Sequence, residues 1–467
     1  MNLLSSTSIF SFFTLISRIL GYLRDILIAF FLGTSIFADA FFVAFRLPNT
    51  FRRLFAEGTF NAAFIPSYTS LRVGNKKIGK KFADDILGSL LLILILIVTI
   101  VEIFTPYLVY IIAPGFIEDE IKFNLAVELT RITFPFLLFV SLSSFFSGIL
   151  NSYNKFAVAA AAPIILNIVL ILSLIVSYKL NLNFAKQLSY GVTLAGVLQL
   201  IFLFFVTLKF YKPNLVFKLR TDSKVKFFFK KLLPSIFSSG ITQINILIGT
   251  IIASFESGAV SYLYYADRIY QINLAIAGIA VGTVSLPVLS KAFKNKNTKE
   301  MSNIQNKSFE LSLLLSIPAC LGLIIASEEI VNALFGYGSF STDDVKKTAE
   351  ALKYFGYGVP AFALVKILSN FFFARDNTKI PFYISTIMVA INISLSLSLF
   401  SIFGFIIIPI ATSLATWIGV LFYIYFLNQK KSLLLNIQLM LNFLKILASA
   451  IIMSFILHLA LIITWII

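Results

Sequence analysis

Arginines gather near the start of this chain with no lysine beside them. Five of the ten arginines precede residue 54, whereas the first lysine is Lys76. A guanidinium group is planar, keeps its charge and can donate two parallel hydrogen bonds to one phosphate. This usage favours a site that holds a phosphate or pyrophosphate group. The five residues are Arg18, Arg24, Arg46, Arg52 and Arg53.

The spacing of these residues predicts two polar stripes on helices. A seven-residue step returns to nearly the same helix face, so one stripe consists of Ser11, Arg18 and Asp25. The second stripe, which Pro48 perturbs, consists of Asp39, Arg46 and Arg53, with Asn49 and Arg52 close to it. A third polar pair, Asp267 and Arg268, recurs much later in the chain.

The charges of this region do not balance. Five arginines face only Asp25, Asp39 and Glu57, and a charge deep in a membrane costs at least about 2–3 kcal/mol. We therefore hypothesise a cationic cavity for an anionic substrate. Two alternatives stay open: Arg53 and Glu57 could be a headgroup anchor and its partner, and Asp39 could simply neutralise Arg18 or Arg46.

Long apolar segments must carry these residues. The chain of 467 residues is 59% hydrophobic and 13% charged, against about 25% charged residues in soluble domains. Stretches of about 20 apolar residues, enough to cross a bilayer, recur throughout, which indicates an all-α polytopic membrane protein. We predict thirteen spans, near residues 7–33, 37–58, 83–113, 124–150, 156–178, 187–208, 228–254, 259–289, 308–326, 347–373, 380–401, 404–427 and 440–467.

The loops orient the predicted spans. Segments 72–81 and 209–231 are strongly basic, whereas the alternate loop 114–120 is acidic. Basic loops stay in the cytoplasm, so we expect a cytoplasmic N-terminus. The excess of basic residues in cytoplasmic loops also explains the net charge of +17, so we expect no nucleic-acid partner.

An internal repeat predicts two lobes. "FAEGTFNAAFIPSYTSL" matches "IAGIAVGTVSLPVLSKAF" with Pro66 over Pro287, and a second match sets Pro135 over Pro360. Six helices in each copy imply a parallel repeat about a pseudo-two-fold axis; coincidence in an apolar sequence is the alternative. We expect lobes at 1–215 and 216–430, followed by an additional helix in 431–467.

Other reactive residues are sparse. The single Cys320 and the single His458 each lie in an apolar run, so we expect no disulfide, metal site or cofactor. The acid groups at 84–85, 117–120 and 343–344 are interpreted as solvated. A membrane glycosyltransferase or phosphatase needs converging carboxylates or histidines, so an enzyme is the weaker alternative, and no nucleotide-binding loop is present.

Several motifs together resemble the MurJ/MviN lipid II flippases of the MOP exporter superfamily. They are "SRILGYLRDILIAFFLG", "ADAFFVAFRLPNTFRRLFAEGTFNAAFIP", "YYADRIYQ", "VGTVSLPVLSK" and "ALFGYGSF". The resemblance implies a monomer in the bacterial inner membrane that moves lipid II to the periplasmic leaflet. It also implies two lobes around a central cavity, alternating access, and a membrane potential or ion gradient as the energy source.

The resemblance also assigns roles to residues. It places the substrate-binding arginines at Arg18, Arg24, Arg52 and Arg268, with Asn49 beside them, and it implies gate pairs for the acids Asp39 and Glu57. Two departures stand out: Gln271 and Asn273 replace a usual Glu and Pro, and one predicted span follows residue 430 where relatives have two. An exporter of drugs or of another lipid-linked oligosaccharide is the alternative within this superfamily.

Overall fold

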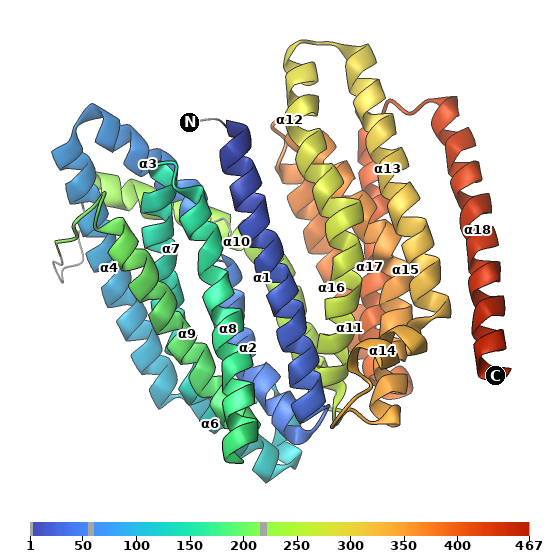
Figure 1. The fold of residues 1–467 in the computed structure, drawn as a ribbon. Coiled ribbons are helices and arrows are strands. Elements are labelled where there is room, and N and C mark those ends of the chain that lie inside the picture. The colour runs from blue at the N-terminus through green and yellow to red at the C-terminus, as the bar shows by residue number, and fades with distance from the viewer. Residues whose placement is uncertain (1–2, 55–59, 215–221, 467) are drawn as a thin grey trace. The chain divides into compact units, whose positions relative to one another are not determined.

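The computed structural model of the chain describes residues 3–54, 60–214 and 222–466, and these residues form helices and no strand (Figure 1). The chain divides into two units, Met1–Gly258 and Ala259–Ile467. Nine candidate spans among the described residues are long and apolar enough to cross a membrane. The protein is therefore a multi-pass membrane protein.

The first unit contains ten α-helices and one 3₁₀ helix among its described residues. These are α1 (Leu3–Leu32), α2 (Ile36–Leu54), α3 (Phe60–Gly74), α4 (Lys76–Ile103), α5 (Thr105–Ile112), η2 (Pro114–Glu118), α6 (Glu120–Thr133), α7 (Phe136–Ser152), α8 (Phe156–Leu180), α9 (Phe184–Thr207) and α10 (Ser223–Ala253).

The second unit is also helical among its described residues. Its elements are α11 (Ala259–Leu274), the π-helical η3 (Ala275–Ala280), α12 (Val281–Lys294), α13 (Thr298–Ile325), α14 (Ser327–Phe335), α15 (Thr342–Phe373), α16 (Lys379–Phe403), η4 (Gly404–Ile406), α17 (Ile407–Gln429) and α18 (Ile437–Ile466). α15 packs against α11, α13 and α17, and α18 packs on α13.

Short polar side chains begin several of these helices. The Asn75 and Asp119 side chains accept hydrogen bonds from first-turn amides of α4 and α6. Ser341 and Asp344 form a capping box at the start of α15. Such caps satisfy amides that lack a partner within the helix, so the connections between apolar helices can stay short.

Stacked aromatic rings hold α3 in the first unit. Phe60, Phe64 and Tyr68 stack at successive centroid distances of 5.3 and 5.5 Å along one face of α3. Phe64 also contacts Phe145 of α7 at 5.2 Å, and Phe82 of α4 at 6.1 Å. These rings bury the apolar face of α3, which also contains Pro66 and Arg72. The sequence analysis did not predict α3 as a span.

The predicted spans correspond to real helices. Each of the thirteen ranges overlaps a helix among the described residues. The count of thirteen membrane crossings stays a prediction, because nine candidate spans are found among these residues. One of the nine, Lys379–Gln429, contains both α16 and α17. The two units divide after Gly258; the repeat-based lobes at 1–215 and 216–430 and the segment 431–467 stay a prediction.

One sequence interpretation was wrong. Asp84 and Asp85 are buried, with 8% and 6% exposure, rather than solvated. The Asp84 carboxylate accepts hydrogen bonds from the Tyr211 hydroxyl at 2.5 Å and from the Asn214 backbone amide at 3.0 Å. Burial, followed by the bond to Asp84, raises the pKa of the Tyr211 hydroxyl far above its usual value, so this hydroxyl donates at neutral pH. The acids at 117–120 and Asp343 are exposed, as predicted.

Candidate functional site

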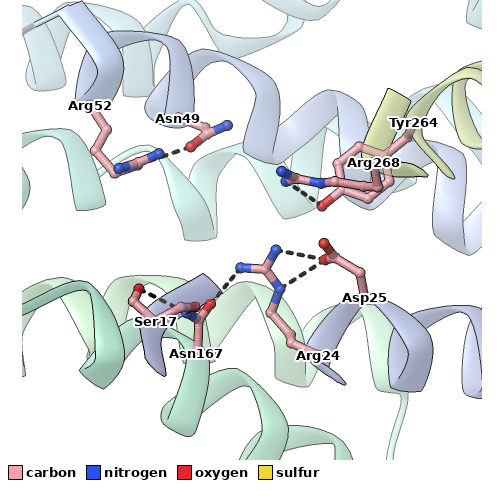
Figure 2. A network of polar contacts seen from close by, with 8 residues as sticks. All are labelled: Ser17, Arg24, Asp25, Asn49, Arg52, Asn167, Tyr264 and Arg268. Carbon is pink, nitrogen blue, oxygen red and sulfur yellow. Dashed lines mark hydrogen bonds and ion pairs between the residues drawn. The ribbon is translucent and has the colours of Figure 1, made fainter. Parts of the chain in front are cut away.

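Arg24 donates three hydrogen bonds to neighbouring side chains. α1 places it inside the first unit with only 6% exposure. Its Nε and Nη2 atoms donate to Oδ1 of Asp25 at 2.9 and 2.6 Å, and Nη1 donates to Oδ1 of Asn167 at 2.9 Å. Figure 2 shows the guanidinium plane between these two partners.

Asn167 links α8 to α1 at two points. Besides accepting from Arg24, its Nδ2 donates to the backbone carbonyl of Ser17 at 2.8 Å (Figure 2). The asparagine is 5% exposed, and α8 packs against α1. Sequence reasoning missed this residue, although a lone amide inside "PIILNIVLIL" is a signal, because polar side chains within apolar spans are rare and often functional.

The first polar stripe changes its environment along α1. Ser11 and Arg18 are exposed, whereas Asp25 is 2% exposed. The seven-residue step therefore predicted the alignment but not the partner of Asp25. Residues i and i+1 do not share a helix face, yet the long arginine side chain folds back so that Arg24 reaches its neighbour. The buried Arg24–Asp25 pair is electrically neutral, and Arg18 remains exposed.

The second stripe lies on α2. Nε of Arg52 donates to Oδ1 of Asn49 at 3.0 Å, one helical turn away (Figure 2). Arg46, Arg52 and Arg53 are all half-buried, and Pro48 lies within the helix. An amide that accepts from Arg52 orients the guanidinium without itself carrying a charge. Glu57 lies outside the described residues.

Asp39 has a partner that the sequence analysis did not name. Oδ2 of Asp39 lies 2.6 Å from Nζ of Lys122 on α6. A pairing of Asp39 with Arg18 or Arg46 stays a prediction. Both side chains are buried, with 0% and 6% exposure. Lys122 follows the exposed acids of 117–120, and nothing in this local sequence distinguishes it from an ordinary solvated lysine.

Arg268 lies on α11 in the second unit. Its Nη2 donates to the hydroxyl of Tyr264 at 2.9 Å, and its guanidinium carbon lies 4.8 Å from the centre of that ring (Figure 2). One turn further, the Gln271 amide donates to the carboxylate of Asp267. The Gln271 side chain thus pairs with Asp267, and the Tyr264 hydroxyl is one partner of Arg268.

Comparison with known proteins identifies the family. The family described as "Lipid II flippase MurJ" matches residues 28–466 of the chain. The chain is 41% identical over 421 residues to the "Probable lipid II flippase MurJ" of Rhizobium tropici, covering 87% of this chain and 77% of that protein. It belongs to the MurJ family.

Further comparisons agree with this MurJ assignment. A "Probable lipid II flippase MurJ" of Rickettsia prowazekii (strain Madrid E) is 40% identical, with 92% of this chain and 85% of that protein covered. The solved structure of "Lipid II flippase MurJ, inward closed conformation" matches with a TM-score of 0.85 at 29% identity, over 97% of this chain and 92% of that one. An inward-facing MATE transporter of the MOP superfamily shares the fold, with a TM-score of 0.71 at 15% identity over 90% of this chain and 95% of that one.

The MurJ residues of the first unit offer hydrogen-bond donors to an anion. Among the described residues, three of the five N–H groups of Arg24 donate to protein acceptors. The other two remain on a planar group that Asp25 and Asn167 orient. Such a group can donate to a phosphate oxygen with little further ordering.

Proposed function

We propose that this chain flips lipid II, the undecaprenyl-pyrophosphate-linked precursor of peptidoglycan, from the cytoplasmic to the periplasmic leaflet. Membership of the MurJ family supports this substrate. The observation that carries the proposal is the buried Arg24, oriented by Asp25 and Asn167 inside an apolar helix bundle. A cation is kept at this depth at substantial cost, and a translocated pyrophosphate gives a reason for it.

The electrostatics of the site suggest how the anion is held and released. Arg18, Arg52 and Arg268 would bring further positive charge to the pyrophosphate, with Asn49 orienting Arg52. Asp25 already neutralises Arg24, so the substrate competes with a carboxylate for this guanidinium. That competition weakens the binding of the anion and so favours its release.

Alternating access of two lobes supplies the movement in this proposal, with membrane potential or an ion gradient as the energy source. Ion pairs and hydrogen-bonded pairs would open and close the gates between the lobes. Their members would be Asp39, Glu57, Asp267, Gln271, Arg46 and Arg53. We place the protein in the bacterial inner membrane as a monomer with a cytoplasmic N-terminus. The basic segments at 72–81 and 209–231 support this orientation.

Substitution of Arg24 tests the proposal. In cells depleted of their own flippase, we expect Arg24→Ala to abolish the appearance of lipid II in the periplasmic leaflet while the protein still inserts. Arg24→Lys should restore export only poorly, because an ammonium group lacks the bidentate fork. Full growth and full export with Arg24→Ala would refute the site, and no export by the wild-type chain would refute the function.

A further inference from the structure

The buried ion pair of Asp39 and Lys122 joins the start of α2 to α6. Nζ of Lys122 lies 2.6 Å from Oδ2 of Asp39 and 4.2 Å from the centre of the Phe116 ring on η2. The lysine is therefore enclosed by a carboxylate and an aromatic face, both of which attract a cation. None of the residues that we assign to lipid II in α1 or α11 belongs to this pair.

The same carboxylate holds the backbone at the junction of the two units. Oδ2 of Asp39 also accepts a hydrogen bond from the backbone amide of Gly258 at 2.9 Å. Gly258 is the last residue of the first unit, and α11 begins at the next residue. Its φ angle of 78° is one that glycine adopts at little cost.

A neighbouring contact holds the residues just before Gly258. The backbone amide of Gly115 in η2 donates to Oγ of Ser254 at 3.0 Å. A Cβ atom at position 115 would lie 2.4 Å from the Ser254 carbonyl oxygen, so only glycine permits this approach. We call Asp39, Lys122 and Gly258, with Gly115 and Ser254, the junction clamp.

We propose that Lys122 is a positioning residue for transport: it orients the Asp39 carboxylate, which in turn fixes the Gly258 amide and the point from which α11 leaves the first unit. When one unit of a protein moves against another, a few residues at the ends of helices or strands absorb the change in backbone angles. Gly258, directly before α11, occupies such a position. A buried carboxylate that loses its cation is strongly disfavoured, so the clamp depends on the lysine. The link to transport rests on the alternating access proposed above.

Hydrogen exchange of the full-length protein in lipid nanodiscs tests the clamp without any substrate. Lys122→Met should make the Gly258 amide exchange at least about tenfold faster, because its charged acceptor is no longer held. Lys122→Arg should leave the exchange rate nearly unchanged. The matched control is Lys186→Met, which removes an exposed pair with Glu128 of almost the same length, 2.7 Å, and should not affect Gly258.

A second variant covers the case in which Lys122→Met does not fold. Asp39→Asn combined with Lys122→Met removes both charges of this pair, and neutral replacements of buried pairs are often tolerated. The Gly258 amide should again exchange at least about tenfold faster, since the acceptor has lost its charge and its anchor. An unchanged exchange rate in the folded single or double variant overturns the clamp.

Lipid II export in flippase-depleted cells tests the link to transport. At equal membrane levels, Lys122→Met should lower the amount of periplasmic lipid II at least about tenfold, Lys122→Arg should restore it, and Lys186→Met should export normally. Faster exchange with wild-type export would overturn the positioning role and leave the proposed function intact. Absence of export by the wild-type chain would refute the proposed function and leave the exchange result in place.

Discussion

Asn167 and Arg24 lie 143 positions apart in the sequence, and Oδ1 of the asparagine accepts a hydrogen bond from Nη1 of the arginine at 2.9 Å. Nδ2 of the same asparagine donates a hydrogen bond to the carbonyl of Ser17, which lies about two helical turns before Arg24. α8 therefore restrains both the backbone and the charged side chain of α1. A guanidinium that is already restrained loses less conformational entropy when it binds an anion.

Asn167→Ala should impair both stability and export. Loss of a buried hydrogen bond to a charged group costs about 1.5–3 kcal/mol, measured as a drop in the free energy of unfolding. Asn167→Asp should also lower stability, because it replaces the donor to the Ser17 carbonyl with a carboxylate oxygen and adds a second buried carboxylate beside Asp25. It should export less lipid II, because its carboxylate competes with the pyrophosphate for Arg24. A double-mutant cycle with Arg24→Ala should give a coupling energy of about 1 kcal/mol or more; strict additivity would contradict the contact.

Asp84→Ala should destabilise the first unit. The substitution leaves the Tyr211 hydroxyl and the Asn214 amide without their acceptor, at about 1–3 kcal/mol for each buried group. Tyr211→Phe should cost less, because it removes only one of these bonds. Asp343→Ala is the control, since that side chain is 67% exposed and should change stability by less than about 1 kcal/mol. Thermal unfolding of the purified variants measures the difference, and equal midpoints would contradict the buried role of Asp84.

The sequence predicted well those features that depend on one helix at a time. Long apolar runs located the helices, because a span needs only enough consecutive apolar residues. The lysine-free start singles out Arg24 and Arg52, because arginine and lysine behave differently as anion ligands; their role in binding stays a prediction. The sequence placed Asn49 and Arg52 close to the same stripe, and a hydrogen bond joins them across one helical turn.

Contacts between distant helices could not be predicted this way. Lys122 lies 83 positions from Asp39 in the sequence, and a single sequence does not show which distant residues meet in the folded chain. The burial of Asp84 could not be predicted, because its partners Tyr211 and Asn214 come from the segment after α9, far along the chain. The Arg24–Asp25 pair was missed for a different reason: the periodicity of a helix describes Cβ directions, whereas a long arginine side chain can fold back.

Gln305 and Asn306 of α13 hold the segment that leads into α18. Oε1 of Gln305 accepts from the Leu434 amide at 2.9 Å, and its Nε2 donates to the Ser432 carbonyl at 3.1 Å. Oδ1 of Asn306 accepts from the Asn436 amide at 3.0 Å, and its Nδ2 donates to the Leu434 carbonyl at 2.8 Å. Two amide side chains thus act as backbone partners for a segment that belongs to no helix, and they set where α18 begins.

Asn306→Leu should therefore loosen the connection to α18. Lys430 and Lys431 are exposed beside this segment, but a protease needs the backbone to open locally before it can cut. Removing two backbone partners should raise the rate of tryptic cleavage at these lysines by about tenfold, since each bond contributes about 0.5–1.5 kcal/mol. Gln438→Ala is the matched control, because Gln438 bonds only to Asn442 of the same helix among the described residues. Equal cleavage rates in the two variants would show that α13 does not anchor α18 through these amides.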